Sequence, residues 1–88
     1  MSVPWDVTWS EKAFKDLNGL DNRLIDRVAD AVERYAQTGA GDIQRLQGIS
    51  PPEWRLRVGD WRVRFAFATA SHAIIVLRVA PRGSAYHG

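Results

Sequence analysis

The feature that most constrains the fold is the alternation of side chains around a Gly-Asp pair in residues 54–68, WRLRVGDWRVRFAFA. Apolar residues occupy every second position on each side of this pair, which is the pattern of two β-strands. A Gly-Asp pair between such strands is typical of a two-residue hairpin loop. The sequence therefore predicts an antiparallel hairpin in which Val58 faces Trp61 across the turn.

This register separates the side chains of the hairpin by their chemistry, because successive side chains of a strand point to opposite faces. One predicted face is apolar and carries Trp54, Leu56, Val58, Trp61, Val63, Phe65 and Phe67. The other face carries four arginines, with Arg57 opposite Arg62 and Arg55 opposite Arg64.

The arginine face is a poor arrangement for stability. Like charges directly opposite each other cost roughly a few tenths to 1 kcal/mol per pair. Residues 44–88 contain seven arginines and only two acids, Glu53 and Asp60, whereas residues 1–43 contain five basic and eight acidic residues. Arginine suits bidentate binding of phosphate or carboxylate. We interpret this face as a binding site for a polyanion; the alternative is a cluster that the protein pairs internally.

The rest of the chain predicts one α+β domain that spans residues 1–88. The alternating segment 3–9 predicts a first strand. Two helices follow, the first with Ser10 as its N-cap and the second beginning after Asp21 and ending near Gly39. The polar face of the second helix is interpreted as solvated.

Residues 40–53 predict a loop in which Leu46 and Ile49 contact the core. With a last strand at 72–80, the expected order is β-α-α-β-β-β. Both helices would pack on one face of a mainly antiparallel, four-stranded sheet.

The alternation of the last strand leads to a further expectation about its faces. A register that keeps Ile75, Leu77 and Val79 on the core side places Arg78 with the arginines of the hairpin. Arg82 lies four residues beyond Arg78, so the same alternation would place it on the arginine face as well.

Composition excludes several function classes. The chain contains no cysteine, which removes disulfides, zinc sites built on thiolates and cysteine nucleophiles. His72 and His87 are too few for a histidine-rich metal site. No apolar run is long enough to span a membrane, and the first residues do not form a signal peptide. We therefore expect a cytoplasmic protein.

Two segments, EWRLRVGDWRVRFAF (53–67) and VLRVAPRGSAY (76–86), resemble the RelE/ParE superfamily of bacterial type II toxins, and the RelE branch most closely. The resemblance covers nearly the whole chain, including IQRLQG at 43–48. It implies a RelE-like fold and a metal-independent endoribonuclease, an mRNA interferase, that needs no cofactor. Such a toxin cuts messenger RNA in the ribosomal A site and is held inactive by a cognate antitoxin. The implied partners are therefore an antitoxin, messenger RNA and the ribosome.

The resemblance also assigns the site. Attack of a ribose 2′-OH on the adjacent phosphate would leave a 2′,3′-cyclic phosphate and a 5′-OH. Positive charge around the phosphorane would stabilise it, and the tail tyrosine would stack on a base or transfer a proton. The implied catalytic residues are Arg57, Arg62, Arg82 and Tyr86. The expected RNA-binding residues are Arg45, Arg55, Arg64 and Arg78, of which the last two are assigned by their face and not by a motif.

Two alternatives remain open at this point. One is a ParE-like inhibitor of DNA gyrase without nuclease activity, and the other is a catalytically inactive relative that binds RNA. The general base is also open, because arginine stays protonated at ordinary pH. His87 has an ordinary pKa suited to acid–base work, although a histidine in a tail is more commonly solvated.

Overall fold

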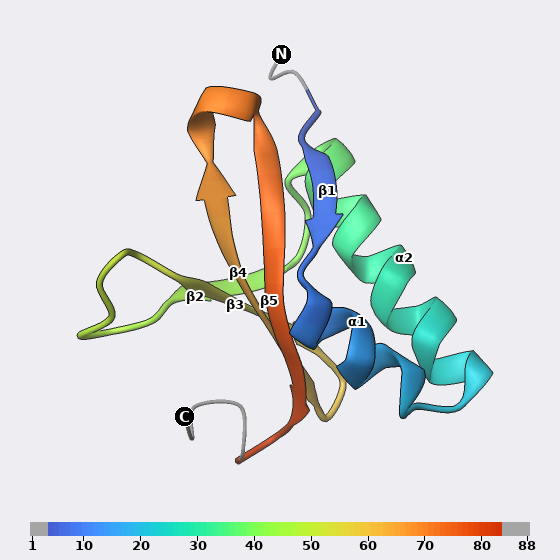
Figure 1. Cartoon of the computed structure of the whole chain (residues 1–88). Coiled ribbons are helices and arrows are strands. Elements are labelled where there is room, and N and C mark those ends of the chain that lie inside the picture. The colour runs from blue at the N-terminus through green and yellow to red at the C-terminus, as the bar shows by residue number, and fades with distance from the viewer. Residues whose placement is uncertain (1–3, 84–88) are drawn as a thin grey trace.

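The structure, a computed structural model, describes residues 4–83 and follows the predicted α+β plan. Its strands form one sheet in the order β1-β5-β4-β3-β2, with β1 parallel to β5 and the other neighbours antiparallel. Both α-helices lie on one side of the sheet, and the loop between β2 and β3 projects away from them (Figure 1). In chain order the elements are β1 (Asp6–Trp9), α1 (Glu11–Asn18), α2 (Asn22–Thr38), β2 (Asp42–Arg45), β3 (Trp54–Val58), β4 (Trp61–Ala68), the 3₁₀ turn η1 (Thr69–Ser71) and β5 (Ala73–Pro81).

Local chemistry sets the helix boundaries as predicted. Ser10 Oγ accepts a hydrogen bond from the Ala13 N–H at 3.1 Å, and Asp21 Oδ1 accepts one from the Leu24 N–H at 2.9 Å. These side chains satisfy backbone donors that have no partner within a helix. The second helix ends at Gly39, whose φ of 76° is the left-handed conformation that glycine adopts without strain.

The hairpin register is also confirmed. Val58 pairs with Trp61, and Arg57 pairs with Arg62. Gly59 occupies the turn with a φ of 59°. The apolar face of the hairpin meets the helices: Leu56, Val58, Val63 and Phe65 are buried, and Trp54, Trp61 and Phe67 pack against them. We call the opposite face of β3 and β4, turned away from the helices, the open face.

The predicted number of strands is wrong, because residues 40–53 are not wholly a loop. Residues Asp42–Arg45 form β2, which pairs antiparallel with β3 at the edge of the sheet. All four residues of β2 are exposed. A strand that buries neither face carries no apolar alternation, so the sequence pattern could not reveal it.

The predicted packing of the loop is wrong as well. Leu46 is only half-buried and Ile49 is 37% exposed, and neither belongs to the core. The Leu46 N–H donates to the Glu53 carbonyl at 2.9 Å, which closes the loop at its base. The two apolar side chains instead line a surface hollow.

The residues that the first half of β5 buries in the core are not those predicted. Ile75 and Leu77 are only half-buried. The buried residues of the strand are Ala73, Ile74, Val76 and Val79. Only Val79 of the three predicted core positions is therefore correct.

A β-bulge at Leu77 explains the difference. Arg64 of β4 pairs with Arg78, but its neighbour Phe65 pairs with Val76, so Leu77 has no opposite residue on β4. The extra residue reverses the alternation along β5. Before the bulge, the even-numbered positions face the core.

Helix α1 covers the edge of β5 where β1 ends. The parallel pairing of β1 stops at Val76. There the Ser10 N–H donates to the Val76 carbonyl at 2.9 Å, and Ser10 Oγ donates to the Leu77 carbonyl at 3.1 Å. One residue thus caps α1 and binds it to the sheet.

Asp16 makes a second connection between α1 and this edge. Its Oδ2 accepts from the Val79 N–H and from Arg78 Nε, both at 2.9 Å. Burial alone would raise the pKa of Asp16, but the hydrogen bonds from Arg78 and Val79 and the charge of Arg78 hold it below its ordinary value. The carboxylate therefore stabilises the fold in its charged form.

Within residues 4–83, no helix is both long enough and apolar enough to cross a lipid bilayer.

The turn glycine provides a test of the hairpin. Gly59→Ala places a Cβ in a left-handed conformation, 2.8 Å from Arg27 Nη2. We expect a loss of about 1–2 kcal/mol in the free energy of unfolding, measured in urea. Gly48→Ala is the matched control, since Gly48 has a φ of 70° and no neighbour within 4 Å. The two variants should lose a similar amount, because the Arg27 guanidinium ends a flexible side chain and can move aside; no loss for Gly59→Ala would contradict the left-handed conformation of the turn.

The carboxylate of Asp16 predicts a pH dependence. A pKa lowered by folding gives stability that is present above the unfolded value of about 3.9 and is lost as the pH falls through the folded value. Asp16→Asn keeps an oxygen for the Val79 N–H but removes the charge beside Arg78. Urea unfolding below about pH 4 should show a steeper loss of stability for the wild type than for this variant. Asp26→Asn, an exposed change on α2, should follow the wild type. If the stability of Asp16→Asn falls with pH as steeply as that of the wild type, the charged Asp16 carboxylate does not stabilise the fold.

Candidate functional site

The hairpin turn gathers three of the predicted site arginines. The Gly59 carbonyl accepts from Arg57 Nε at 3.3 Å and from Arg62 Nη1 at 3.2 Å. The Asp60 carbonyl accepts from the Arg82 N–H at 2.7 Å, which places the start of the tail beside the turn. We call Arg57, Arg62 and Arg82 the turn cluster.

Arg62 is the most constrained member of the turn cluster. Its residue is only 9% exposed, and its guanidinium donates to two backbone carbonyls, those of Gly59 and Trp61, at 3.2 Å each. Within residues 4–83, no carboxylate forms an ion pair with any member of the turn cluster. A cation removed from water without an anionic partner is costly. The turn cluster is therefore suited to receive an external anion.

Two other predicted arginines already have carboxylate partners. Arg64 donates to Glu53 Oε1 through Nε at 3.0 Å and Nη2 at 2.7 Å, in a largely buried pair. Arg78 is turned toward α1, where Asp16 binds it. Both arginines therefore have a carboxylate partner within the protein, as the alternative of an internally paired cluster expects, and their part in RNA binding stays a prediction.

The remaining predicted RNA-binding residues lie near β2. Arg55, on the open face, donates through Nη2 to the Gln44 side-chain oxygen. Arg45 pairs with Trp54, a residue of the apolar face, and its guanidinium lies 5.7 Å from the centre of the Trp54 ring. Arg45 therefore lies on the opposite face from Arg57, and the structure does not bring it to the turn cluster.

The structure adds one arginine that the sequence did not place. The guanidinium of Arg27, on α2, lies against the turn: a Cβ at Gly59 would be 2.8 Å from its Nη2. Spacing along a helix shows which side chains share a face but not what that face meets, so the sequence left Arg27 in solvent. Tyr86 and His87, the predicted tail residues, lie outside the described residues.

His72, at the far end of the β4–β5 hairpin, takes no part in this site. Its ring stacks on Trp5, with ring centres 4.0 Å apart and planes at 8°. Within residues 4–83 there is no group of three histidine or carboxylate side chains that could hold a metal ion.

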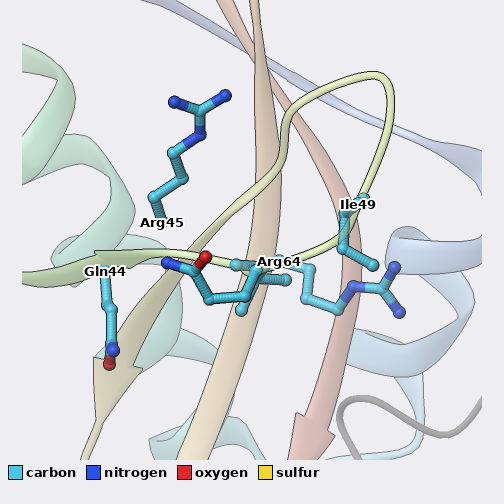
Figure 2. A pocket seen from close by; sticks show the side chains of 6 residues that line it. Gln44, Arg45, Ile49 and Arg64 are labelled. Carbon is cyan, nitrogen blue, oxygen red and sulfur yellow. The ribbon is translucent and has the colours of Figure 1, made fainter.

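A hollow of about 400 Å³ opens beside this site, between the β2–β3 loop and the open face. It is lined by Gln44, Arg45, Leu46, Gln47, Ile49 and Arg64. Figure 2 shows the Arg64 side chain reaching toward Ile49, while the side chain of Arg45 points away from both. A second hollow, of about 430 Å³, lies between α2 and β3, and Arg57 forms part of its wall.

Solved structures share this fold. The RelE–RelB complex of Pyrococcus horikoshii OT3 matches with a TM-score of 0.75 and 23% identity, over 94% of this chain and 100% of the other. The RelBE2 toxin–antitoxin complex of Mycobacterium tuberculosis matches with a TM-score of 0.70 and 23% identity, over 91% and 100%. The RelB–RelE complex of Methanococcus jannaschii also gives a TM-score of 0.70 at 23% identity, over 90% and 94%. Curated protein sequences gave no match.

The fold is thus the one shared by toxins of the RelE/ParE superfamily. At the level of sequence, the family described as "ParE toxin of type II toxin-antitoxin system, parDE" matches residues 7–86, and the chain belongs to that family. The predicted superfamily is confirmed. The family that matches is ParE, whereas the resemblance seen in the sequence was closest to RelE.

The division of the arginines predicts how binding of a single-stranded polyanion depends on salt. A positive group that contacts a phosphate of a single strand contributes about 0.7 to the slope of log K against log salt. Arg57→Gln should therefore reduce the slope by about this amount. Arg78→Gln removes the same net charge from an arginine that Asp16 already holds, so it should change the slope little.

Fluorescence anisotropy with a labelled 2′-O-methyl oligonucleotide, at a series of KCl concentrations, measures this difference. Circular dichroism of both variants checks that they fold. Equal slopes for the two variants would show that the ion pairs do not decide which arginines are available to an anion.

Proposed function

We propose that the protein is an mRNA interferase, a toxin that inhibits translation by cleaving messenger RNA. The observation that carries this proposal is the gathering of Arg57 and Arg62 on the Gly59 carbonyl, beside Arg82, with no internal carboxylate paired to them in residues 4–83. One of these cations is buried. A phosphodiester supplies the anion that such a site lacks.

The proposed reaction needs only positioning and charge. The 2′ oxygen of a ribose forms a bond to the adjacent phosphorus, and the bond from phosphorus to the 5′ oxygen breaks. The proton of the 2′-OH goes to a general base, and the leaving 5′ oxygen takes up a proton. A 2′,3′-cyclic phosphate and a 5′-OH result.

The turn cluster acts on the charge of this reaction. The phosphorane gains negative charge, and cations already fixed in place stabilise it without reorganisation. Arg62 is fixed by two carbonyls and Arg57 by one, so both guanidinium groups are positioned before substrate arrives. Arg82 supplies the third cation, and Tyr86 remains our candidate for stacking on a base.

The partners follow from the same proposal. A toxin of a type II system is held by a cognate antitoxin, and two RelE structures similar to this chain, from Pyrococcus horikoshii OT3 and Methanococcus jannaschii, were solved as complexes with RelB. We extend this to the chain itself, which we expect to bind an antitoxin and, when released, messenger RNA in the ribosomal A site in the cytoplasm.

A second candidate function is inhibition of DNA gyrase without nuclease activity, as in the ParE branch. Two observations favour it. The family that matches residues 7–86 is the ParE family. The ion pairs of Arg64 and Arg78 also leave a smaller available basic set than the sequence predicts.

Mapping of RNA 5′ ends after brief expression in bacteria distinguishes the two functions. We expect new ends with a 5′-OH inside coding sequences, together with arrest of translation. Intact transcripts combined with blocked DNA supercoiling would replace the proposed function with the second candidate.

The turn cluster provides the matching variant. Arg62→Gln combined with Arg82→Gln should lower the cleavage rate at least about 100-fold, as expected when fixed donors to a developing charge are removed. Binding of the antitoxin and circular dichroism show whether the variant folds. Arg23→Gln, an exposed change on α2, is the control; undiminished cleavage by the double variant would remove both arginines from the site.

A further inference from the structure

The hollow beside Arg64 has features of a ligand site that the turn cluster does not use. Its volume of about 400 Å³ is that of a small-molecule pocket. Leu46 and Ile49 supply apolar surface, although both lie in a loop outside the core. Gln47 supplies an amide that can donate and accept hydrogen bonds, while Gln44, whose side-chain oxygen accepts from Arg55, offers its NH₂ group as a donor.

The electrostatics of the hollow differ from those of the turn cluster. Arg64 is bound by Glu53 through two nitrogens, so its charge is balanced and its planar guanidinium is held in place. A fixed guanidinium plane is a surface on which a nucleobase stacks. The hollow therefore favours an uncharged, planar, polar ligand over a phosphate.

The hollow also lies beside the turn cluster. Arg64 and Arg62 point to the same face of β4, two residues apart, a step of about 7 Å along the strand. The row of Gln44, Arg55 and Arg64 and the row of Asp42, Arg57 and Arg62 are neighbours on the open face. A nucleotide whose phosphate lies at Arg62 has its base within reach of Arg64.

From this juxtaposition we propose that the hollow formed by the β2–β3 loop and Arg64 is a nucleobase subsite, which sets the nucleotide preference of the toxin. The proposal rests on the proposed function, because it takes the ligand at the turn cluster to be RNA. In this subsite a base stacks on Arg64 against Ile49, and Gln47 hydrogen-bonds to its edge. Arg64 thus serves RNA binding as a platform and not as a phosphate-binding cation.

Nuclear magnetic resonance titration tests the subsite without requiring cleavage. The probes are 2′-O-methyl trinucleotides of each base, and the same sugar-phosphate chain without bases. We expect the base-bearing trinucleotides to shift the Ile49 methyl and Gln47 amide signals, with one base giving the largest shifts. The chain without bases should shift only signals of the turn cluster. If both kinds of probe leave Ile49 and Gln47 unchanged, the subsite is refuted.

Variants of two exposed residues provide a second measurement. Gln47→Ala combined with Ile49→Ala should weaken binding of the preferred trinucleotide at least about five-fold, the lower end of what one stacked base contributes. Binding of the chain without bases should stay the same. Gln37→Ala, an exposed glutamine on α2, is the matched control. Equal loss for both probes, or no loss, would overturn the proposal.

The two proposals fail in different ways. A wild type that cuts no RNA but shows the base-dependent shifts loses the proposed nuclease and keeps the subsite. A wild type that cuts RNA, with the double variant cutting at the same nucleotides and the same KM, keeps the nuclease and loses the subsite.

Discussion

The two-residue turn at Gly59-Asp60 is the constraint on which the site depends. It fixes which residues of β3 and β4 face each other, and a slip of one residue would exchange the apolar face for the arginine face. The same turn provides the two carbonyls that hold the turn cluster together. Register and site geometry therefore have a single origin, a glycine in a left-handed conformation.

The arginines of the sheet are sorted by where carboxylates can reach them. Arg64 lies next to the base of the β2–β3 loop, where Glu53 meets it, and Arg78 lies at the edge that Asp16 covers. Among residues 4–83, no carboxylate forms an ion pair with an arginine at the turn end of the hairpin, although Asp42 lies opposite Arg57. A face that looks uniform in sequence thus becomes two regions: a neutralised one, which fixes side chains in place, and a charged one, which is suited to an anion.

Sequence patterns predicted the parts of the fold that local chemistry controls. The caps at Ser10 and Asp21 and the hairpin register depend on neighbours within a few residues, and all three are confirmed. The exposed strand β2 has no alternation of apolar and polar residues that could predict it, and the bulge at Leu77 reverses the alternation along β5. Each of these depends on which backbone lies alongside, which spacing in one chain does not encode.

The predicted site shows the same limit. The positions of Arg57 and Arg62 followed from alternation, because their neighbours are set by the turn. The partner of Arg78 did not, since Asp16 is 62 positions away along the chain, and alternation gives no sign that Glu53, 11 positions from Arg64, binds that arginine. Asp16 lies outside residues 44–88, the segment whose shortage of acids suggested an external anion. Helix α2 likewise brought Arg27 to the turn through a contact that no local pattern foretold.

The parallel pairing of β1 with β5 has a consequence for folding during synthesis on the ribosome. Ser10 donates a hydrogen bond to Leu77, 67 positions away, and β1 lies along the beginning of β5, so the sheet is completed through contacts between segments far apart in the sequence. Contacts of such long separation form late, because a large loop has to close first. While the ribosome is still synthesising β5, β1 has no strand to pair with, and α1 has no edge of β5 to cover. The sheet can therefore be completed only after β5 has been synthesised.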